Sequence, residues 1–124
     1  GFLTGSLVDV AALEAKDIRR KMPRFEPAAY AANLRLLEEY ARLARAAHAS
    51  MTQLALAWVL ARGAHVVAIP GTTSSAHLEE NLGAAAVQLQ PDVLARLDVL
   101  LNQRTIVGER YDAATQAEVD TENF

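Results

Sequence analysis

The sequence contains no cysteine, which excludes a disulfide framework, a thiolate nucleophile and a thiolate metal site. It also lacks an apolar run of about eighteen residues, the length that a membrane-spanning helix requires, and its start shows no signal-peptide pattern. Acidic residues outnumber basic ones by 15 to 12, so no broad positive field is available for nucleic acid. We therefore expect a cytoplasmic protein with neither a membrane nor a nucleic acid as partner.

Apolar residues, in contrast, make up 52% of the 124 residues, enough for the core of a single domain. Their spacing predicts a mostly helical chain, with Ser50 and Gln53 as a capping box and Pro91 as the first residue of the last helix. The helix after Ser50 is apolar nearly all round, so we expect it to be buried. The expected helices cover residues 10–20, 27–48, 51–62, 75–82 and 91–101, and the polar tail beyond Gln103 is expected to be irregular.

The segment 66–81 is the most informative part of the chain. Four apolar residues at 66–69 predict a strand that is covered on both faces, and Pro70 and Gly71 end it. Ser74 or Ser75 can cap the helix that follows. The free N–H groups at the start of such a helix face the turn and favour an anion. The pattern is therefore typical of a phosphate or nucleotide site, although many segments of this kind are only connectors.

The strand at 66–69 has no strong second strand elsewhere in the sequence. An unpaired buried strand leaves main-chain N–H and C=O groups without hydrogen bonds. Its partners must therefore come from outside this chain.

Five segments, in order, resemble the aldo-keto reductase family. The sequence I-P-G-T at 69–72, followed by L-E-E-N at 78–81, is similar to the family's cofactor-binding segment. The others are similar to the loop after the seventh barrel strand, an R-x-x-M-P-R-F stretch, the penultimate helix and the C-terminal tail, and lie at residues 1–5, 19–25, 53–60 and 108–111. The resemblance implies an α/β fold in which residues 1–124 form the C-terminal portion of a (β/α)₈ TIM barrel, with 66–69 as its eighth strand.

The resemblance also implies an oxidoreductase that reduces aldehydes or ketones with NADP(H), or with NAD(H), and that this segment holds the adenosine half of the cofactor. Gly71 and Thr72 match positions near the adenosine-side phosphate, and Glu80 and Asn81 match the pair that binds the adenine. Leu3, Thr4 and Gly5 are expected near the pyrophosphate. Where many relatives place Lys or Arg against the 2′-phosphate, this chain has small residues, hydroxyls and one imidazole, at Gly71, Thr73, Ser74 and His77.

The family's catalytic Asp, Tyr, Lys and His motifs do not occur in this chain, so we assign no catalytic residue here. We expect the tyrosines and lysines of this chain to pack in the core or lie on the surface, and not to take part in catalysis. They are Tyr30, Tyr40, Tyr111, Lys16 and Lys21. The three histidines lack the spacing of a metal site, so no metal is expected at His48, His65 or His77.

Two questions stay open from the sequence. One basic cluster is either a solvated loop or a loop over the phosphates of the cofactor, and it comprises Arg19, Arg20, Lys21 and Arg24. The chain itself is either part of an active reductase or a non-catalytic barrel fragment or helical interaction module. The carbonyl substrate and the oligomeric state are not indicated by the sequence.

Overall fold

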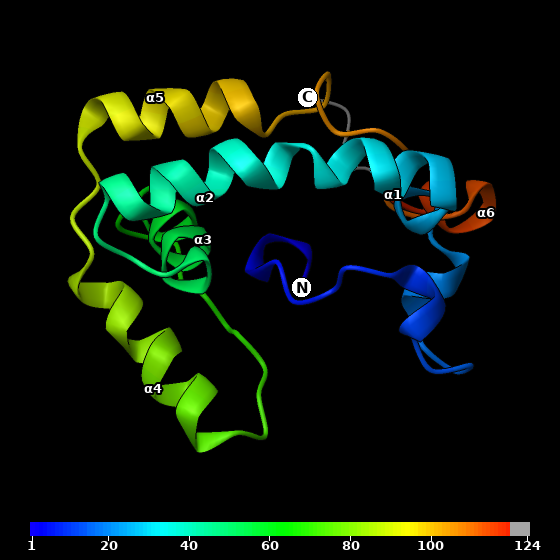
Figure 1. Cartoon of the computed structure of the whole chain (residues 1–124), viewed down its shortest axis with the longest axis horizontal. Coiled ribbons are helices and arrows are strands. Elements are labelled where there is room, and N and C mark those ends of the chain that lie inside the picture. Colours follow the sequence, from blue (N-terminus) through cyan, green and yellow to red (C-terminus); the bar gives the residue numbers. More distant parts are fainter. Residues whose placement is uncertain (120–124) are drawn as a thin grey trace.

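The computed structural model describes residues 1–119, which form α-helices and short 3₁₀-helices (Figure 1). The elements in chain order are η1 (Phe2–Thr4), η2 (Val10–Ala12), η3 (Ile18–Lys21), η4 (Pro23–Phe25), α1 (Pro27–Leu34), α2 (Leu36–Ala46), α3 (Met51–Leu60), α4 (Ser75–Gly83), η5 (Ala84–Ala86), α5 (Pro91–Leu100) and α6 (Ala113–Gln116). Within residues 1–119, no helix has the combined length and apolar content of a membrane-spanning segment.

The long amphipathic helix expected over residues 27–48 is formed by α1 and α2 in a single row (Figure 1). Arg35 separates them, but its φ of −62° and ψ of −28° keep the right-handed helical conformation. Its N–H donates to the carbonyl of Ala32, three residues back, so the break is a local tightening of the helix.

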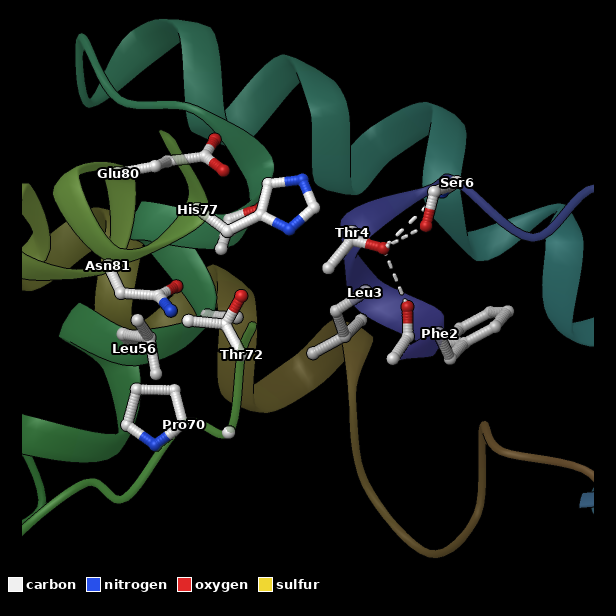
Figure 2. Close-up of a pocket in the computed structure, with 14 residues that line it drawn as sticks. Phe2, Leu3, Thr4, Ser6, Leu56, Pro70, Thr72, His77, Glu80 and Asn81 are labelled. Atoms are coloured by element: carbon white, nitrogen blue, oxygen red, sulfur yellow. Dashed lines mark hydrogen bonds between the residues drawn. The ribbon is translucent and has the colours of Figure 1, made fainter. Parts of the chain in front are cut away.

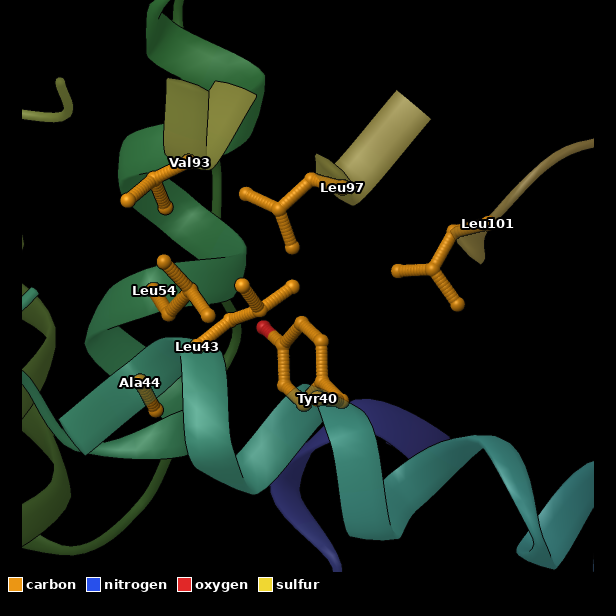
Figure 3. Packing of buried hydrophobic residues seen from close by; sticks show 7 residues of the cluster. All are labelled: Tyr40, Leu43, Ala44, Leu54, Val93, Leu97 and Leu101. Carbon is orange, nitrogen blue, oxygen red and sulfur yellow. The ribbon is translucent and has the colours of Figure 1, made fainter. Parts of the chain in front are cut away.

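The core lies where α2, α3 and α5 meet, and α5 runs along α2 (Figures 1 and 3). Tyr40 and Leu43, which lie three residues apart on one face of α2, are both fully buried. Leu97 of α5 and Leu54 of α3 are also fully buried, as Figure 3 shows. The core-facing sides of α2 and α5 therefore carry apolar residues at helical spacing.

The capping box predicted at the start of α3 is present. The Ser50 hydroxyl accepts from the Gln53 N–H at 3.1 Å, and the Gln53 side-chain oxygen accepts from the Ser50 N–H at 3.0 Å. The expected burial of this helix on all sides is wrong, because Leu54 and Ala57 are buried while Val59 is 40% exposed. In the described chain α3 has neighbours on only part of its circumference.

The strand expected at residues 66–69 is not formed. No strand occurs among residues 1–119, and this segment is an irregular connection between α3 and α4. Val67 and Ile69 are 78% and 92% exposed, contrary to the burial expected for them. The physical reason is the absence of a partner strand, because strand hydrogen bonds need a second chain segment alongside.

Two further expectations need correction at the ends of the chain. The single helix expected over residues 10–20 is replaced by η2 and η3, which are separated by irregular chain and are capped by the side chains of Asp9 and Asp17. The tail beyond Gln103 is irregular except for α6, where Asp112 accepts from the first-turn N–H groups. Residues 120–124, which belong to the same expected tail, lie outside the described residues.

Candidate functional site

A cleft of about 720 Å³ opens between η1, α3, α4 and the loop before α4 (Figure 2). Its wall on one side is the N-terminal segment, and on the other side it is α4 and the loop before that helix. The lining residues are Gly1, Phe2, Leu3, Thr4, Ser6, Thr52, Ala55, Leu56, Pro70, Gly71, Thr72, His77, Glu80 and Asn81.

The cleft brings together most of the residues that the sequence singled out. Those that line it are Leu3, Thr4, Gly71, Thr72, His77, Glu80 and Asn81. Gly5, Thr73 and Ser74 are not among the lining residues, but two of them shape its walls. Gly5 ends η1 with a φ of 71°, a conformation that favours glycine, and Ser74 caps α4.

Hydroxyl groups hold the loop before α4 in place. The Thr72 hydroxyl accepts from the Ser74 N–H at 3.1 Å, and the Ser74 hydroxyl accepts from the His77 N–H at 3.4 Å. The first N–H groups of an α-helix have no partner within the helix and carry its positive dipole end. The start of α4 therefore offers main-chain donors beside Gly71 and Thr72.

The opposite wall is also rich in hydroxyls. The side chain of Thr4 donates to the carbonyl of Gly1 at 2.7 Å and lies 2.7 Å from the Ser6 hydroxyl (Figure 2). A Cβ on Gly5 would lie 3.2 Å from the Met51 side chain, so η1 packs closely on the start of α3.

Glu80 and Asn81 point into the cleft from α4 (Figure 2). One carboxylate oxygen of Glu80, Oε1, accepts a hydrogen bond from the Ser50 hydroxyl at 2.7 Å. This contact joins α4 to the N-terminal end of α3 and holds the carboxylate. The arrangement presents an anchored carboxylate and a neutral amide side by side, together with an apolar floor from Ala55 and Leu56.

The basic cluster does not reach the cleft, because none of its members is among the lining residues. Arg19 binds Asp17 at 2.6 Å and, with its hydrogen bonds, lowers the pKa of that carboxyl to about 2. Arg20 donates to the carbonyl of Leu13 at 2.8 Å, and Arg24 donates to the carbonyl of Gly108 at 2.9 Å. In this structure the cluster organises the chain around η3 and η4.

The tyrosines lie away from the cleft. Tyr30 donates to the carbonyl of Leu7 at 2.6 Å, and Tyr40 donates to that of Met51 at 2.9 Å. Burial raises the pKa of both phenols. The packing role expected for Tyr40 is confirmed, since its side chain is fully buried in the core. Residues 1–119 contain no group of three His, Cys, Asp or Glu that is placed to hold a metal ion.

Sequence reasoning missed the floor of the cleft. Thr52, Ala55 and Leu56 lie on one face of α3, three and four residues apart. Thr52 lies between Ser50 and Gln53 of the capping box, so the sequence could have placed it at the N-terminal end of α3, which borders the cleft. Phe2 and Pro70 lie within segments that were singled out, and Ser6 directly follows one of them.

The chain is similar to known proteins over most of its length. The profile of the Aldo/keto reductase family matches residues 1–102. The chain is 35% identical over 111 residues to the aldo-keto reductase yakc of Schizosaccharomyces pombe, whose name specifies NADP(+), and 33% identical over 110 residues to the aldo-keto reductase str7 of Strobilurus tenacellus. These alignments cover 90% and 89% of the chain, which spans 33% of the length of each relative. No solved structure matches the chain significantly. The match over most of its length shows that the chain belongs to the aldo/keto reductase family.

Proposed function

We propose that this chain is the C-terminal third of an NAD(P)H-dependent aldo-keto reductase that reduces aldehydes or ketones, and that its cleft holds the adenosine half of the cofactor. One observation carries the proposal. The structure gathers Leu3 and Thr4 with Thr72, Glu80 and Asn81, about seventy residues further along the chain, around one cleft. The name of the Schizosaccharomyces pombe relative supports NADP(H) as the cofactor.

The donors and acceptors in the cleft fit an adenosine phosphate. The Asn81 amide can both donate and accept at the edge of an adenine ring, and the Glu80 carboxylate can accept from its exocyclic amine. Ala55 and Leu56 supply apolar surface beneath the ring. The Thr72 hydroxyl and the first N–H groups of α4 are the donors that we propose for the phosphate oxygens. A Cβ on Gly71 would meet nothing within 4 Å, so its main chain is open to a ligand.

The cofactor supplies the hydride for the carbonyl carbon when it is bound. The residues of this chain bind and orient the adenosine end. The proton donor comes from outside residues 1–124, because the family's Tyr, Lys, Asp and His motifs do not occur in them.

We further propose that residues 66–69 form the eighth strand of a (β/α)₈ barrel when the remaining two thirds of the family's length is present. Val67 and Ile69 support this proposal because they are β-branched, apolar and exposed on a segment without a partner. Pairing with neighbouring strands would bury both side chains and satisfy the main chain. The cleft would then lie at the C-terminal face of the barrel, where such folds place their sites.

The experiment uses the full-length protein that carries this segment. Glu80→Ala and Asn81→Ala should each raise the dissociation constant of NADPH by about tenfold, the equivalent of one lost hydrogen bond of about 1.4 kcal/mol. The value of kcat at saturating cofactor should stay nearly constant, because adenine contacts act equally in the ground and transition states. Fluorescence titration and steady-state kinetics measure the two quantities.

Glu79→Ala is the matched control, since Glu79 is an exposed neighbour on α4 that does not line the cleft. It should leave the dissociation constant unchanged. Unaltered NADPH affinity in both Glu80→Ala and Asn81→Ala would contradict the proposal.

A further inference from the structure

Ser50 makes hydrogen bonds to two helices at once. Its hydroxyl accepts from the Gln53 N–H at 3.1 Å, which caps α3, and donates to Oε1 of Glu80 at 2.7 Å on α4. A hydroxyl has only one proton to donate. The proton of Ser50 is therefore committed to Glu80, while its lone pair serves the cap.

Nothing else in the described chain holds the Glu80 carboxylate. Among residues 1–119, Ser50 is its only hydrogen-bond partner, and Glu80 forms no ion pair there. A hydrogen bond from a neutral donor to a carboxylate is stronger than one between neutral groups. The rotamer that Glu80 presents to the cleft thus depends on the hydroxyl of residue 50.

The second member of the capping box also contacts α4. A Cβ on Gly83 would lie 2.6 Å from Nε2 of Gln53, so a glycine allows this close approach of the two helices. Between Ser50 and Gln53 lies Thr52, which lines the cleft itself. The N-terminal end of α3 is therefore the support against which the cofactor-facing side of α4 is placed.

We propose that Ser50 is a positioning residue for the cofactor, which acts through Glu80 and sets the affinity for the adenosine half. The inference rests on the proposed function and deepens it, because it names a residue outside the cleft lining that governs binding. Ser50 does not line the cleft, and of the two hydrogen-bond partners of its hydroxyl, Gln53 and Glu80, only Glu80 does.

The two roles of Ser50 are chemically separable. Helix capping needs only an acceptor, and aspartate caps as well as serine does. Ser50→Asp therefore keeps the cap on α3 but removes the proton donor and sets a second carboxylate against Glu80. Ser50→Gly also removes the donor, adds no charge and costs the cap little. Ser50→Thr retains both the acceptor and the donor.

The test measures the dissociation constants of NADPH and of nicotinamide mononucleotide, which lacks the adenosine half, for the full-length protein. Ser50→Asp and Ser50→Gly should weaken NADPH binding about tenfold, the usual effect of one lost hydrogen bond to a charged group. Ser50→Thr should stay within about twofold of the unchanged protein, since it keeps the hydrogen bond. Binding of nicotinamide mononucleotide should not change in any variant.

A double-variant cycle with Glu80→Ala tests the route of the effect. Once Glu80 is absent, Ser50→Gly should cause no further loss of NADPH affinity. An additive loss, or an equal loss for nicotinamide mononucleotide, would show a general structural effect and overturn the inference. Normal NADPH binding by Ser50→Gly would overturn it as well, provided that Glu80→Ala weakens binding. Normal binding by Glu80→Ala, with weakened binding by Asn81→Ala, would overturn the inference alone. Normal binding by both Glu80→Ala and Asn81→Ala would remove the proposed function on which the inference rests.

Discussion

The hydroxyl of Tyr40 donates a hydrogen bond to the main-chain carbonyl of Met51 at 2.9 Å and ties α2 to the first turn of α3. The ring is fully buried in the core. We expect Tyr40→Phe to lower the free energy of unfolding at neutral pH by about 1 kcal/mol, the usual net value of one such bond. Urea denaturation of both proteins measures the difference.

The same contact predicts a pH dependence. Burial raises the pKa of Tyr40 above its unfolded value of 10.0, so the folded state holds the phenolic proton more tightly than the unfolded state does. This contribution is complete below about pH 10 and is lost as the pH rises further. Tyr40→Phe should therefore lose less stability between pH 8 and pH 11 than the unchanged protein. Equal losses would contradict the assignment.

Asn33 should anchor the C-terminal segment. Its side-chain amide donates to the carbonyl of Val107 at 2.9 Å, and its oxygen accepts from the Val107 N–H at 2.8 Å. The residue is only 3% exposed. Asn33→Ala should cost about 2 kcal/mol, since it removes two largely buried hydrogen bonds.

Hydrogen exchange at the Val107 amide is the direct measurement, and exchange should become faster in Asn33→Ala. Asn33→Asp keeps the acceptor for the Val107 amide but not the donor for the Val107 carbonyl. The exchange rate of this amide in Asn33→Asp should therefore lie between the rates in the unchanged protein and in Asn33→Ala. An unchanged rate in Asn33→Ala would show that other contacts hold this segment.

His77 should govern the choice between NADPH and NADH in the full-length protein. Among residues 1–119, those that line the cleft include no Lys or Arg, so these side chains offer a 2′-phosphate no guanidinium or ammonium group. His77→Arg should favour NADPH over NADH by about tenfold or more, because a charge-assisted bond contributes roughly 1.5–3 kcal/mol. The ratio of the two dissociation constants is the measurement. If His77→Arg lowered the dissociation constants of NADPH and NADH equally, residue 77 would not contact the 2′-phosphate.

Val67 and Ile69 should be dispensable in the chain of residues 1–124 alone. They are 78% and 92% exposed, and exposed positions usually change stability by less than about 0.5 kcal/mol. Val67→Lys with Ile69→Lys should leave the thermal midpoint nearly unchanged. Because exposed apolar side chains promote association, the variant should also self-associate less and bind less of a dye that reports exposed apolar surface. Calorimetry and sedimentation measure these effects.

The same double substitution should prevent folding of the full-length protein if residues 66–69 are a buried barrel strand there. A full-length protein that folds and binds NADPH normally with both lysines would contradict the strand assignment. A large loss of stability in the short chain would contradict the exposure of these side chains.

Many of the helix positions were predictable from the sequence because they depend on residues within a few positions of each other. Pro91 starts α5, and the reciprocal bonds of Ser50 and Gln53 start α3 as expected. The break at Arg35 was not visible in the apolar spacing, which continues through α1 and α2. The strand expected at 66–69 shows the limit of such reasoning, because a strand exists only with a neighbour.

The sequence by itself determined most of the helical segments and where several of them begin, and its resemblance named several of the residues that line the cleft. Only the tertiary structure decided that Thr4 and Asn81 face one cleft, that Ser50 holds Glu80, and that Asn33 binds Val107. Such contacts join residues that are thirty or more positions apart, and they follow from how whole helices pack against one another. No local pattern encodes that packing, because the position and direction of each helix depend on all its neighbours together.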